Sequence, residues 1–217
     1  MGEDNPVGDK KVVVLVVDMQ DNMWNGDGDV YEKLAQKRMQ AMGMLAEDID
    51  TFTNDMRANG AQIVWVLLDN DELSNYGDLA FNLHRQEGDL EIHKTGQSPL
   101  PENIEFFEGL KEQADLNAQF LDVKVCGVWA LECVANTAVT LHEGGYNVRV
   151  VGDLILDSGK PCMDDDRPDF REAHALHVMG EATGIGPEIS EWSYEVVSEQ
   201  KVIASISSQD IKDDPEP

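Results

Sequence analysis

The feature that most constrains the fold is an almost unbroken apolar run from Lys11 to Asp18, which reads Lys-Val-Val-Val-Leu-Val-Val-Asp. A strand with one face in the core alternates apolar and polar residues, so a continuous run is typical of a parallel strand covered on both faces. The run therefore predicts a central strand packed between helices. Asp18 ends this strand. It is either a cap for the following turn or a paired, working group, because an unpaired buried charge is costly.

The rest of the chain alternates further strands with helices. The other predicted strands are Gln62 to Leu68, Glu91 to Lys94, Phe120 to Val128, Tyr146 to Val151, and either Glu195 to Val197 or Val202 to Ile206. Helical spacing of apolar residues predicts helices between Tyr31 and Asn59, over Pro101 to Gln113, from Cys133 to the Gly144-Gly145 pair, and over Asp169 to Thr183. This order predicts an α/β fold with a mostly parallel central sheet and helices on both faces, a Rossmann-like three-layer sandwich.

The length of 217 residues suits one well-buried α/β domain and is short for two. We expect a single domain over residues 11–207, a flexible polar arm at residues 1–10 and an acidic tail at residues 208–217. Two polar segments, Gln20 to Asp29 and Asn70 to Gly88, are expected to be loops at the edge of the sheet that carries the site.

The chain is strongly acidic, with 16 Lys and Arg residues, 43 Asp and Glu residues and a formal net charge of −27. This charge argues against nucleic acid or an anionic membrane as a partner and predicts a solvated, self-repelling surface. No apolar run approaches the roughly 20 residues that span a bilayer, and the N-terminus lacks a signal-peptide pattern. Three cysteines without disulfide-like spacing indicate a reducing compartment, so we expect a cytoplasmic protein.

Three residues of different chemistry, Asp18, Lys94 and Cys133, fall at or just beyond the carboxyl ends of three predicted strands. Each alone has an ordinary explanation, but these ends share one edge of a parallel sheet, so the side chains can converge. The predicted helix start at Cys133 favours a thiolate and can hold an oxyanion. A carboxylate that accepts the thiol proton and a cation that stabilises the anions would make this cysteine a nucleophile. Cys126 lies within a strand and Cys162 beside acids, so neither is expected to be activated.

With these residues the chain resembles the isochorismatase-like cysteine hydrolases, which include nicotinamidases and carbamoylsarcosine amidases. The matching segments are Val12 to Asp18 with Met19-Gln20, Lys94 with Ser98, and Gly127-Val128-Trp129-Ala130-Leu131-Glu132-Cys133-Val134 with Thr137-Ala138. The last segment is the specific one, because its glycine, cysteine and Thr-Ala pair stand at the family's spacing. The resemblance covers nearly the whole chain.

The resemblance implies Cys133 as nucleophile, Asp18 as general base and Lys94 as the cation that tunes the pair. It also implies a cis peptide bond between Val128 and Trp129, and an oxyanion hole made by the backbone N–H groups of Trp129 and Cys133. The implied reaction is attack of the thiol on a carbonyl, loss of ammonia or an amine, and hydrolysis of the thioester by a water that the base activates. A small-molecule substrate and a homo-oligomer are implied as well.

Two departures from the family pattern bear on the substrate. Trp129 stands where the family usually has a small residue, so its side chain either narrows the pocket or offers a stacking surface. Nicotinamidases carry an Asp-x-His motif that binds a metal, whereas the matching place here reads Asp69-Asn70-Asp71, with His84 as the only histidine of the following loop. An intact zinc site is therefore not expected, and we predict no metal and no cofactor.

Three functions are compatible with these residues. The first is a hydrolase that cleaves a C–N bond of a small non-peptide amide or carbamoyl compound, the second an isochorismatase- or nicotinamidase-type hydrolase, and the third a non-catalytic binding or assembly protein whose pocket Trp129 blocks. Relatives that cleave isochorismate resemble one another in having another residue in place of Cys133, so this cysteine favours the first. The candidate substrate-binding residues are Asn22, Trp24, Trp129 and Arg85, the last as a partner for a carboxylate.

Overall fold

The computed structural model describes residues 11–20, 32–69, 79–81, 83–113, 121–156 and 195–197. Its centre is a six-stranded sheet in the order β3-β2-β1-β4-β5-β6, with every pair of neighbouring strands parallel. The strands are β1 (Val12–Val17), β2 (Gln62–Leu68), β3 (Leu90–Lys94), β4 (Asp122–Val128), β5 (Asn147–Leu156) and β6 (Glu195–Val197). The described helices are α1 (Glu32–Ala58), α2 (Ile104–Gln113) and α3 (Ala135–Glu143), with a π-helical turn, Ala130–Val134, before α3. The predicted α/β class is confirmed.

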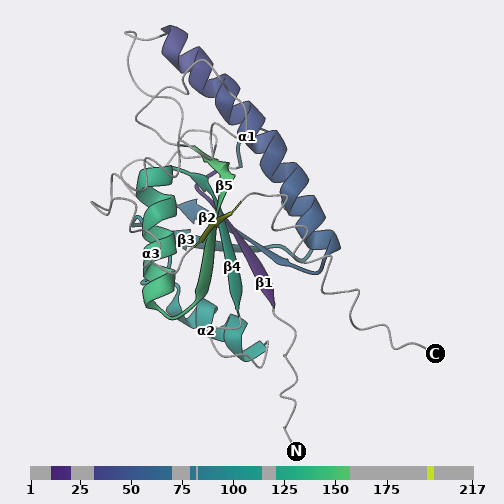
Figure 1. Ribbon diagram of the computed structural model, residues 1–217, viewed down its shortest axis with the longest axis vertical. Helices are drawn as coiled ribbons and strands as arrows, with labels where there is room; N and C mark the ends of the chain where they lie inside the picture. The colour runs from purple at the N-terminus through teal and green to yellow at the C-terminus, as the bar shows by residue number, and fades with distance from the viewer. Residues whose placement is uncertain are drawn as a thin grey trace, which may run out of the picture.

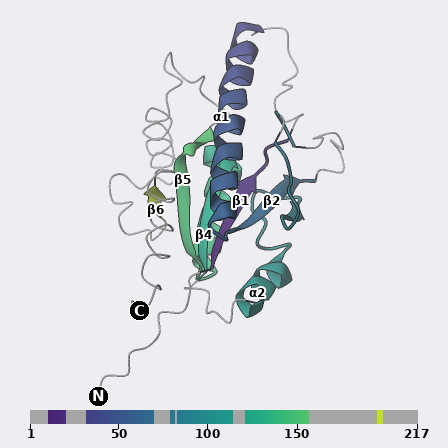
Figure 2. The same ribbon diagram turned by 90° about the vertical axis from the view of Figure 1, so that its right-hand side faces the viewer.

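Helices cover both faces of the sheet, with α1 on one side and α2 and α3 on the other (Figure 1). The run that forms β1 requires this arrangement, because all of its residues are buried. Alternate residues enter the two cores: Val12, Val14 and Val16 the core under α1, and Val13, Leu15 and Val17 the core under α2 and α3. Figure 2 looks onto the face of the sheet that α1 covers. Leu45, Ile49 and Phe52 repeat at helical spacing along α1 and are buried in the core beneath it.

The strand order puts the switch point of the sheet at β1, since β2 and β3 lie on one side of it and β4, β5 and β6 on the other. In folds of this kind ligands bind at the carboxyl ends of the strands beside the switch point. Asp18 directly follows β1, and Trp129 with the π-helical turn directly follows β4. The topology alone therefore points to this edge as the site.

The end of β5 differs from the sequence prediction. β5 runs to Leu156 rather than ending at Val151, because the Gly152-Asp153 pair does not interrupt the strand. Its register against β4 breaks instead, between Val125 and Gly127. The Gly152-Asp153 pair, which suggests a strand end in the sequence, thus lies at a local irregularity in the pairing of a longer strand.

α2 begins at Ile104 rather than at Pro101, because Asn103 holds a turn in front of it. The Asn103 side chain donates to the carbonyl oxygens of His93, at 2.7 Å, and Pro99, at 3.0 Å. The last strand among the described residues is β6, which lies at the first of the two predicted places. Several predictions lie outside the described residues: the arm at residues 1–10, the loop at 21–29, the helix at 169–183, the alternative strand at 202–206 and the tail at 208–217.

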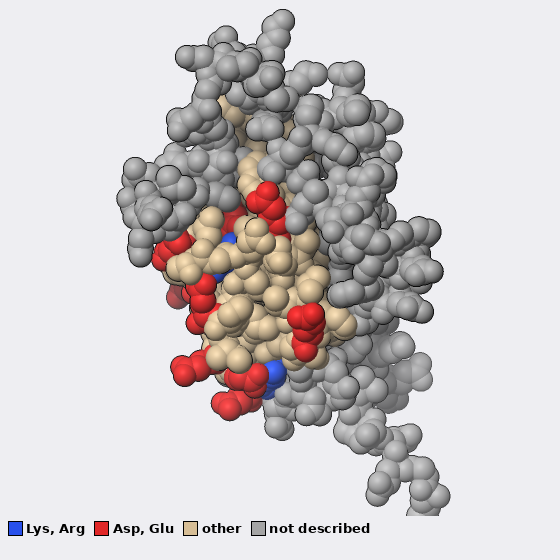
Figure 3. All heavy atoms as spheres, turned by 90° about the vertical axis from the view of Figure 1, so that its left-hand side faces the viewer, with Lys and Arg blue, Asp and Glu red and all other residues tan. Residues whose placement is uncertain are grey.

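The face over α2 and α3 carries acidic side chains around a broad uncharged area, with little Lys or Arg surface in view (Figure 3). This pattern matches the excess of acids in the sequence. Within the part of the chain that the structure describes, no helix combines the length and the hydrophobicity that crossing a membrane requires.

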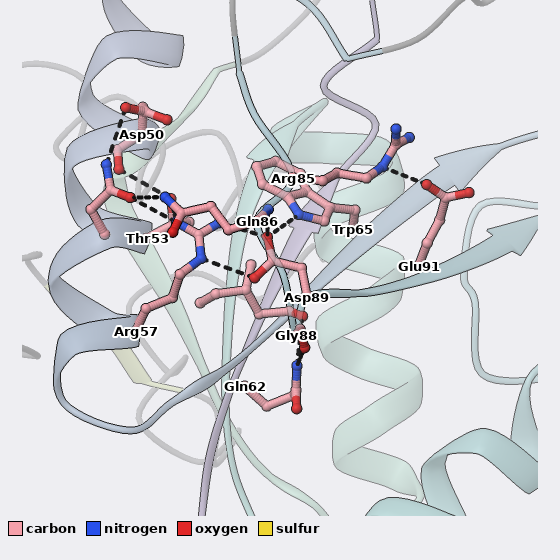
Figure 4. Close-up of polar contacts among 12 residues, drawn as sticks. Asp50, Thr53, Arg57, Gln62, Trp65, Arg85, Gln86, Gly88, Asp89 and Glu91 are labelled. Atoms are coloured by element: carbon pink, nitrogen blue, oxygen red, sulfur yellow. Dashed lines mark hydrogen bonds and ion pairs between the residues drawn. The ribbon is translucent and has the colours of Figure 1, made fainter.

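A partly buried ion pair joins α1 to the edge of the sheet (Figure 4). The carboxylate of Asp89, just before β3, accepts hydrogen bonds from Arg57 Nε and Nη2 at 2.9 and 2.7 Å, from Trp65 Nε1 at 2.9 Å and from the Gln86 N–H at 3.0 Å. Burial opposes the charged form, but the hydrogen bonds, led by that of Arg57, hold the pKa of Asp89 below its ordinary value. Asp89 therefore fixes the end of α1 against β2 as a carboxylate.

We expect Asp89→Ala to lower the free energy of unfolding by about 2–4 kcal/mol, because it leaves the donors of Arg57 and Trp65 without their acceptor. The pKa of Asp89 is lowered in the folded state, so its contribution is present above the unfolded-state pKa and is lost as the pH falls through the folded-state pKa. Urea unfolding at neutral and acidic pH measures the difference in the free energy of unfolding between wild type and variant. This difference should become smaller at acidic pH.

The matched control is Glu108→Gln, which removes the ion pair with Lys111 from a side chain that is 55% exposed. An exposed pair of this kind contributes little, so the change should stay within about 0.5 kcal/mol. Equal losses for Asp89→Ala and Glu108→Gln would contradict the role assigned to Asp89.

Candidate active site

Asp18 is held at the end of β1 by backbone that turns away from the regular strand. Its φ of 54° lies in the left-handed region, which Asp adopts more readily than most residues. Its N–H donates to the carbonyl of Val66 at 2.9 Å, and its carbonyl accepts from the N–H of Gln20 at 2.9 Å. The side chain has no exposed surface. The turn thus places a buried carboxylate at the carboxyl edge of the sheet.

Gln20 secures the same turn through its side chain. Its Oε1 accepts from the N–H of Leu68 at 2.8 Å, and its Nε2 lies 3.4 Å from the carbonyl oxygen of Leu68. The amide thus pairs with the last residue of β2 much as a further residue of β1 would. Sequence reasoning noticed Met19-Gln20 as part of a motif but assigned Gln20 no role.

Gly127 brings β4 close enough to β1 to build the site. Its φ is +112°, and a Cβ at this position would lie 2.2 Å from the carbonyl oxygen of Val17 and 2.7 Å from its nitrogen. Only glycine permits both the backbone conformation and the approach. The next peptide bond but one, between Val128 and Trp129, is cis, at the place that the family resemblance implies.

Lys94, the last residue of β3, brings the three predicted residues together. Its buried Nζ donates to Asp18 Oδ2 at 2.9 Å, to Cys133 Sγ at 3.2 Å and to the carbonyl oxygen of Gly96 at 3.0 Å. An ammonium group has three N–H donors, and all three are used here. Convergence of Asp18, Lys94 and Cys133, inferred from their places at the ends of separate strands, is what the structure shows.

The surroundings of Cys133 differ from the prediction. The helical backbone begins at Ala130 as a π-helical turn, so Cys133 lies inside the turn and not at the start of a helix. Its side chain is almost fully buried. Burial and then the negative charge of Asp18 raise the pKa of Cys133 to about 12, against the lowering effect of Lys94. The expected thiolate is therefore wrong for the resting site, because desolvation outweighs the nearby cation.

Asp18 has the properties of a base for this thiol. Burial raises the pKa of Asp18 above its ordinary value, although the charge of Lys94 acts to lower it. A carboxylate with a raised pKa binds a proton more tightly than an exposed one. Its Oδ1 is buried and has no hydrogen-bond partner among the described residues, whereas Oδ2 is bound by Lys94. Oδ1 is thus the oxygen available to accept a proton.

The structure does not bring the two described substrate-binding candidates, Arg85 and Trp129, together as it does Asp18, Lys94 and Cys133. Arg85 pairs with Glu91, which lies on the face of β3 opposite Ile92, so the structure does not bring it to Cys133 (Figure 4). Trp129 is half-buried and packs against the core on the α1 side of the sheet. Asn22 and Trp24 lie outside the described residues.

The described residues at the metal-motif position do not form a zinc site. The carboxylate of Asp69 lies 2.9 Å from His93 Nδ1, and His84 is exposed, while Asp71 lies outside the described residues. In the described part of the chain no group of three or more His, Cys, Asp or Glu is arranged to hold a metal ion. Zinc in proteins takes three or four such ligands.

The isochorismatase domain model matches residues 12–175, more than half of the chain. The chain belongs to the isochorismatase family. This confirms the resemblance drawn from the glycine, cysteine and Thr-Ala spacing. No curated protein matches the sequence.

Solved structures of other proteins share the fold of this chain over most of its length. An isochorismatase-like hydrolase from Alkaliphilus metalliredigens has 16% identity and a TM-score of 0.60, with 90% of this chain and 98% of that chain covered. A cysteine hydrolase from Pseudomonas syringae pv. phaseolicola has 16% identity and a TM-score of 0.61, with 96% of each covered. A pyrazinamidase of Pyrococcus horikoshii in complex with zinc has 16% identity and a TM-score of 0.53, with 87% and 99% covered.

We expect Gly127→Ala to lower the free energy of unfolding by about 2–4 kcal/mol, because the new Cβ collides with the backbone of Val17 and disfavours the positive φ. Displacement of Val17 also moves Asp18, so alkylation of Cys133 by iodoacetamide should change as well. Urea unfolding and mass spectrometry of the Cys133 peptide measure the two effects. Gly60→Ala is the matched control, since Gly60 also has positive φ but its Cβ would meet nothing within 4 Å. A cost at Gly127 no larger than that at Gly60 would contradict the clash.

Asp18→Asn should make Cys133 more acidic, because it removes a negative charge that raises the pKa of the thiol and leaves the Lys94 ammonium beside it. A pKa lower by one unit gives roughly tenfold more thiolate at a given pH. The rate of iodoacetamide alkylation of Cys133 against pH measures this change, with Cys126 and Cys162 of the same sample as internal controls. An unchanged or slower reaction of Cys133 would show that Asp18 does not hold the thiol in its protonated form.

Proposed function

We propose that this chain is a cysteine-dependent hydrolase that cleaves a C–N bond of a small non-peptide amide or carbamoyl compound through a thioester intermediate. Membership of the isochorismatase family supports a hydrolase. The observation that carries the finer proposal is the buried contact of Lys94 Nζ with both Asp18 and Cys133. A thiol beside a base and a cation is the arrangement that nucleophilic acyl transfer needs.

In the first half of the reaction the Cys133 sulfur bonds to the substrate carbonyl carbon and its proton passes to Asp18. Because the resting thiol is protonated, proton transfer has to accompany attack. The Lys94 ammonium contacts both partners and stabilises the negative charge as it moves from one to the other. The carbonyl oxygen becomes an oxyanion, for which we propose the backbone N–H groups of Trp129 and Cys133 as donors. The C–N bond then breaks, and Asp18 returns the proton to the leaving nitrogen.

In the second half a water molecule attacks the thioester. Asp18, again a carboxylate, accepts a proton from the water as the C–O bond forms. The C–S bond breaks, and Asp18 gives that proton back to the sulfur, so the acid product leaves and the thiol is restored. The sequence of steps consumes one substrate and one water and releases ammonia or an amine with the corresponding acid.

Two features of the site favour this proposal over the other hydrolase types. A cysteine in contact with a base provides a nucleophile, which cleavage of isochorismate does not require. A zinc-dependent nicotinamidase site would need a donor set that the described residues do not form, since Asp69 is paired with His93 and position 71 is an aspartate.

The test is ammonia release from a panel of small amides, ureas and carbamoyl acids in metal-free buffer. Cys133→Ala should lower the rate by about three orders of magnitude or more, since it removes the nucleophile. Asp18→Asn should also lose hydrolysis, although its thiol is expected to alkylate faster. Faster alkylation together with lost hydrolysis in Asp18→Asn would show that Asp18 acts as the base and not as the nucleophile.

Cys126→Ala is the matched control, because Cys126 is a buried cysteine within β4 whose sulfur lies 3.6 Å from the carbonyl oxygen of Leu15. It should retain the turnover of the wild type. Release that persists in Cys133→Ala would reject the cysteine mechanism. Absence of release from every compound, together with a Cys133 that does not alkylate, would favour a binding or assembly role.

A further inference from the structure

The loop between β3 and α2 is held by a carboxylate that neither the family motif nor the mechanism includes. Glu102 accepts three hydrogen bonds: from the Thr95 N–H at 2.7 Å, from Thr95 Oγ1 at 2.7 Å and from the Gly96 N–H at 3.2 Å. The hydrogen bond from the Thr95 side chain is the largest of the effects that lower the pKa of Glu102, and the charge of Lys94 adds to them. Glu102 is therefore a carboxylate clamp on the first two residues of the loop.

Gly96 links this clamp to the active site. Its N–H is bound by Glu102, and its carbonyl oxygen accepts the third hydrogen bond of the Lys94 ammonium. The three donors of an ammonium group point in fixed relative directions, so the position of one acceptor restricts the other two donors. The Gly96 carbonyl thus helps to aim the remaining N–H groups at Asp18 and Cys133.

The next two residues of the loop, Gln97 and Ser98, are tied to α3, which directly follows the π-helical turn that carries Cys133. The hydroxyl of Ser98 is hydrogen bonded to that of Thr140, and Gln97 Oε1 accepts from Asn136 Nδ2 at 2.7 Å. Asn136 Nδ2 also donates to the carbonyl of Glu132 at 2.8 Å, the residue before Cys133. The loop is consequently held in two ways, within itself through Glu102 and to the π-helical turn and α3 through these side chains.

We propose that Glu102 is a positioning residue that, through the Gly96 carbonyl, aims the Lys94 ammonium at Asp18 and Cys133. Its importance for turnover rests on the proposed function, but its effect on the thiol does not, because alkylation needs no amide substrate. A residue that only stabilised the loop would alter the free energy of unfolding and leave the reactivity of Cys133 as it is.

The experiment measures iodoacetamide alkylation of Cys133 across a neutral-to-alkaline pH series in the full chain, by mass spectrometry of the Cys133 peptide. In Glu102→Ala the Gly96 carbonyl is no longer fixed, so Lys94 lowers the pKa of the thiol less effectively. We expect the pH profile to move to higher pH and the rate at a given pH to fall roughly three- to tenfold. Glu105→Ala is the matched control, since Glu105 is an exposed acid three residues further along the chain, in the first turn of α2, and it should leave the profile unchanged.

Glu102→Gln keeps one carboxamide oxygen for Thr95 and Gly96 and should restore part of the rate lost in Glu102→Ala. If Glu102→Ala does not fold, Glu102→Gln alone tests the proposal, because its alkylation profile should still lie at higher pH than that of the wild type. An unchanged or faster reaction in the folded Glu102 variants would overturn the proposal. That result is distinct from a failure of the amidohydrolase proposal, which would show as absent ammonia release with an intact Glu102 effect on the thiol.

Discussion

The burial of the Lys94 ammonium beside the Asp18 carboxylate is the interaction on which the site depends. Removing a single charge of either sign from water is costly, so each of these two residues lowers the cost of burying the other. The two come from β3 and β1, which β2 separates, and Gln20 holds the end of β2 between them. Long-range strand pairing is thus what makes a charged site possible in an apolar core.

The same pair determines the protonation of Cys133. Opposite charges on Asp18 and Lys94 act in opposite directions on the sulfur, so burial decides, and the thiol keeps its proton. In the proposed mechanism one proton moves among these groups, and the site does not hold a preformed thiolate at the end of a helix dipole. The carboxylate and the ammonium would then both have to lie within contact of the nucleophile.

The parts of this structure that follow from position along the chain could be predicted from the sequence, and those that follow from local packing could not. Asp18, Lys94 and Cys133 were placed together because the ends of parallel strands share an edge, whatever the details of the loops. The π-helical turn escaped prediction because its apolar spacing resembles that of the helix it precedes. The pKa of Cys133 depends on how completely neighbouring segments exclude water, and the position of the Arg85 side chain depends on its ion pair with Glu91. Neither property appears as a pattern in the sequence.

A cysteine that stays protonated at rest is also protected from oxidation. Peroxides react with the thiolate and hardly at all with the neutral thiol, so the burial that raises the pKa of Cys133 also disfavours its conversion to sulfenic acid. In the proposed mechanism Cys133 becomes strongly nucleophilic only as its proton passes to Asp18 during attack on a substrate carbonyl. The buried charges around the sulfur would thus favour its reaction with a bound substrate over its reaction with small oxidants.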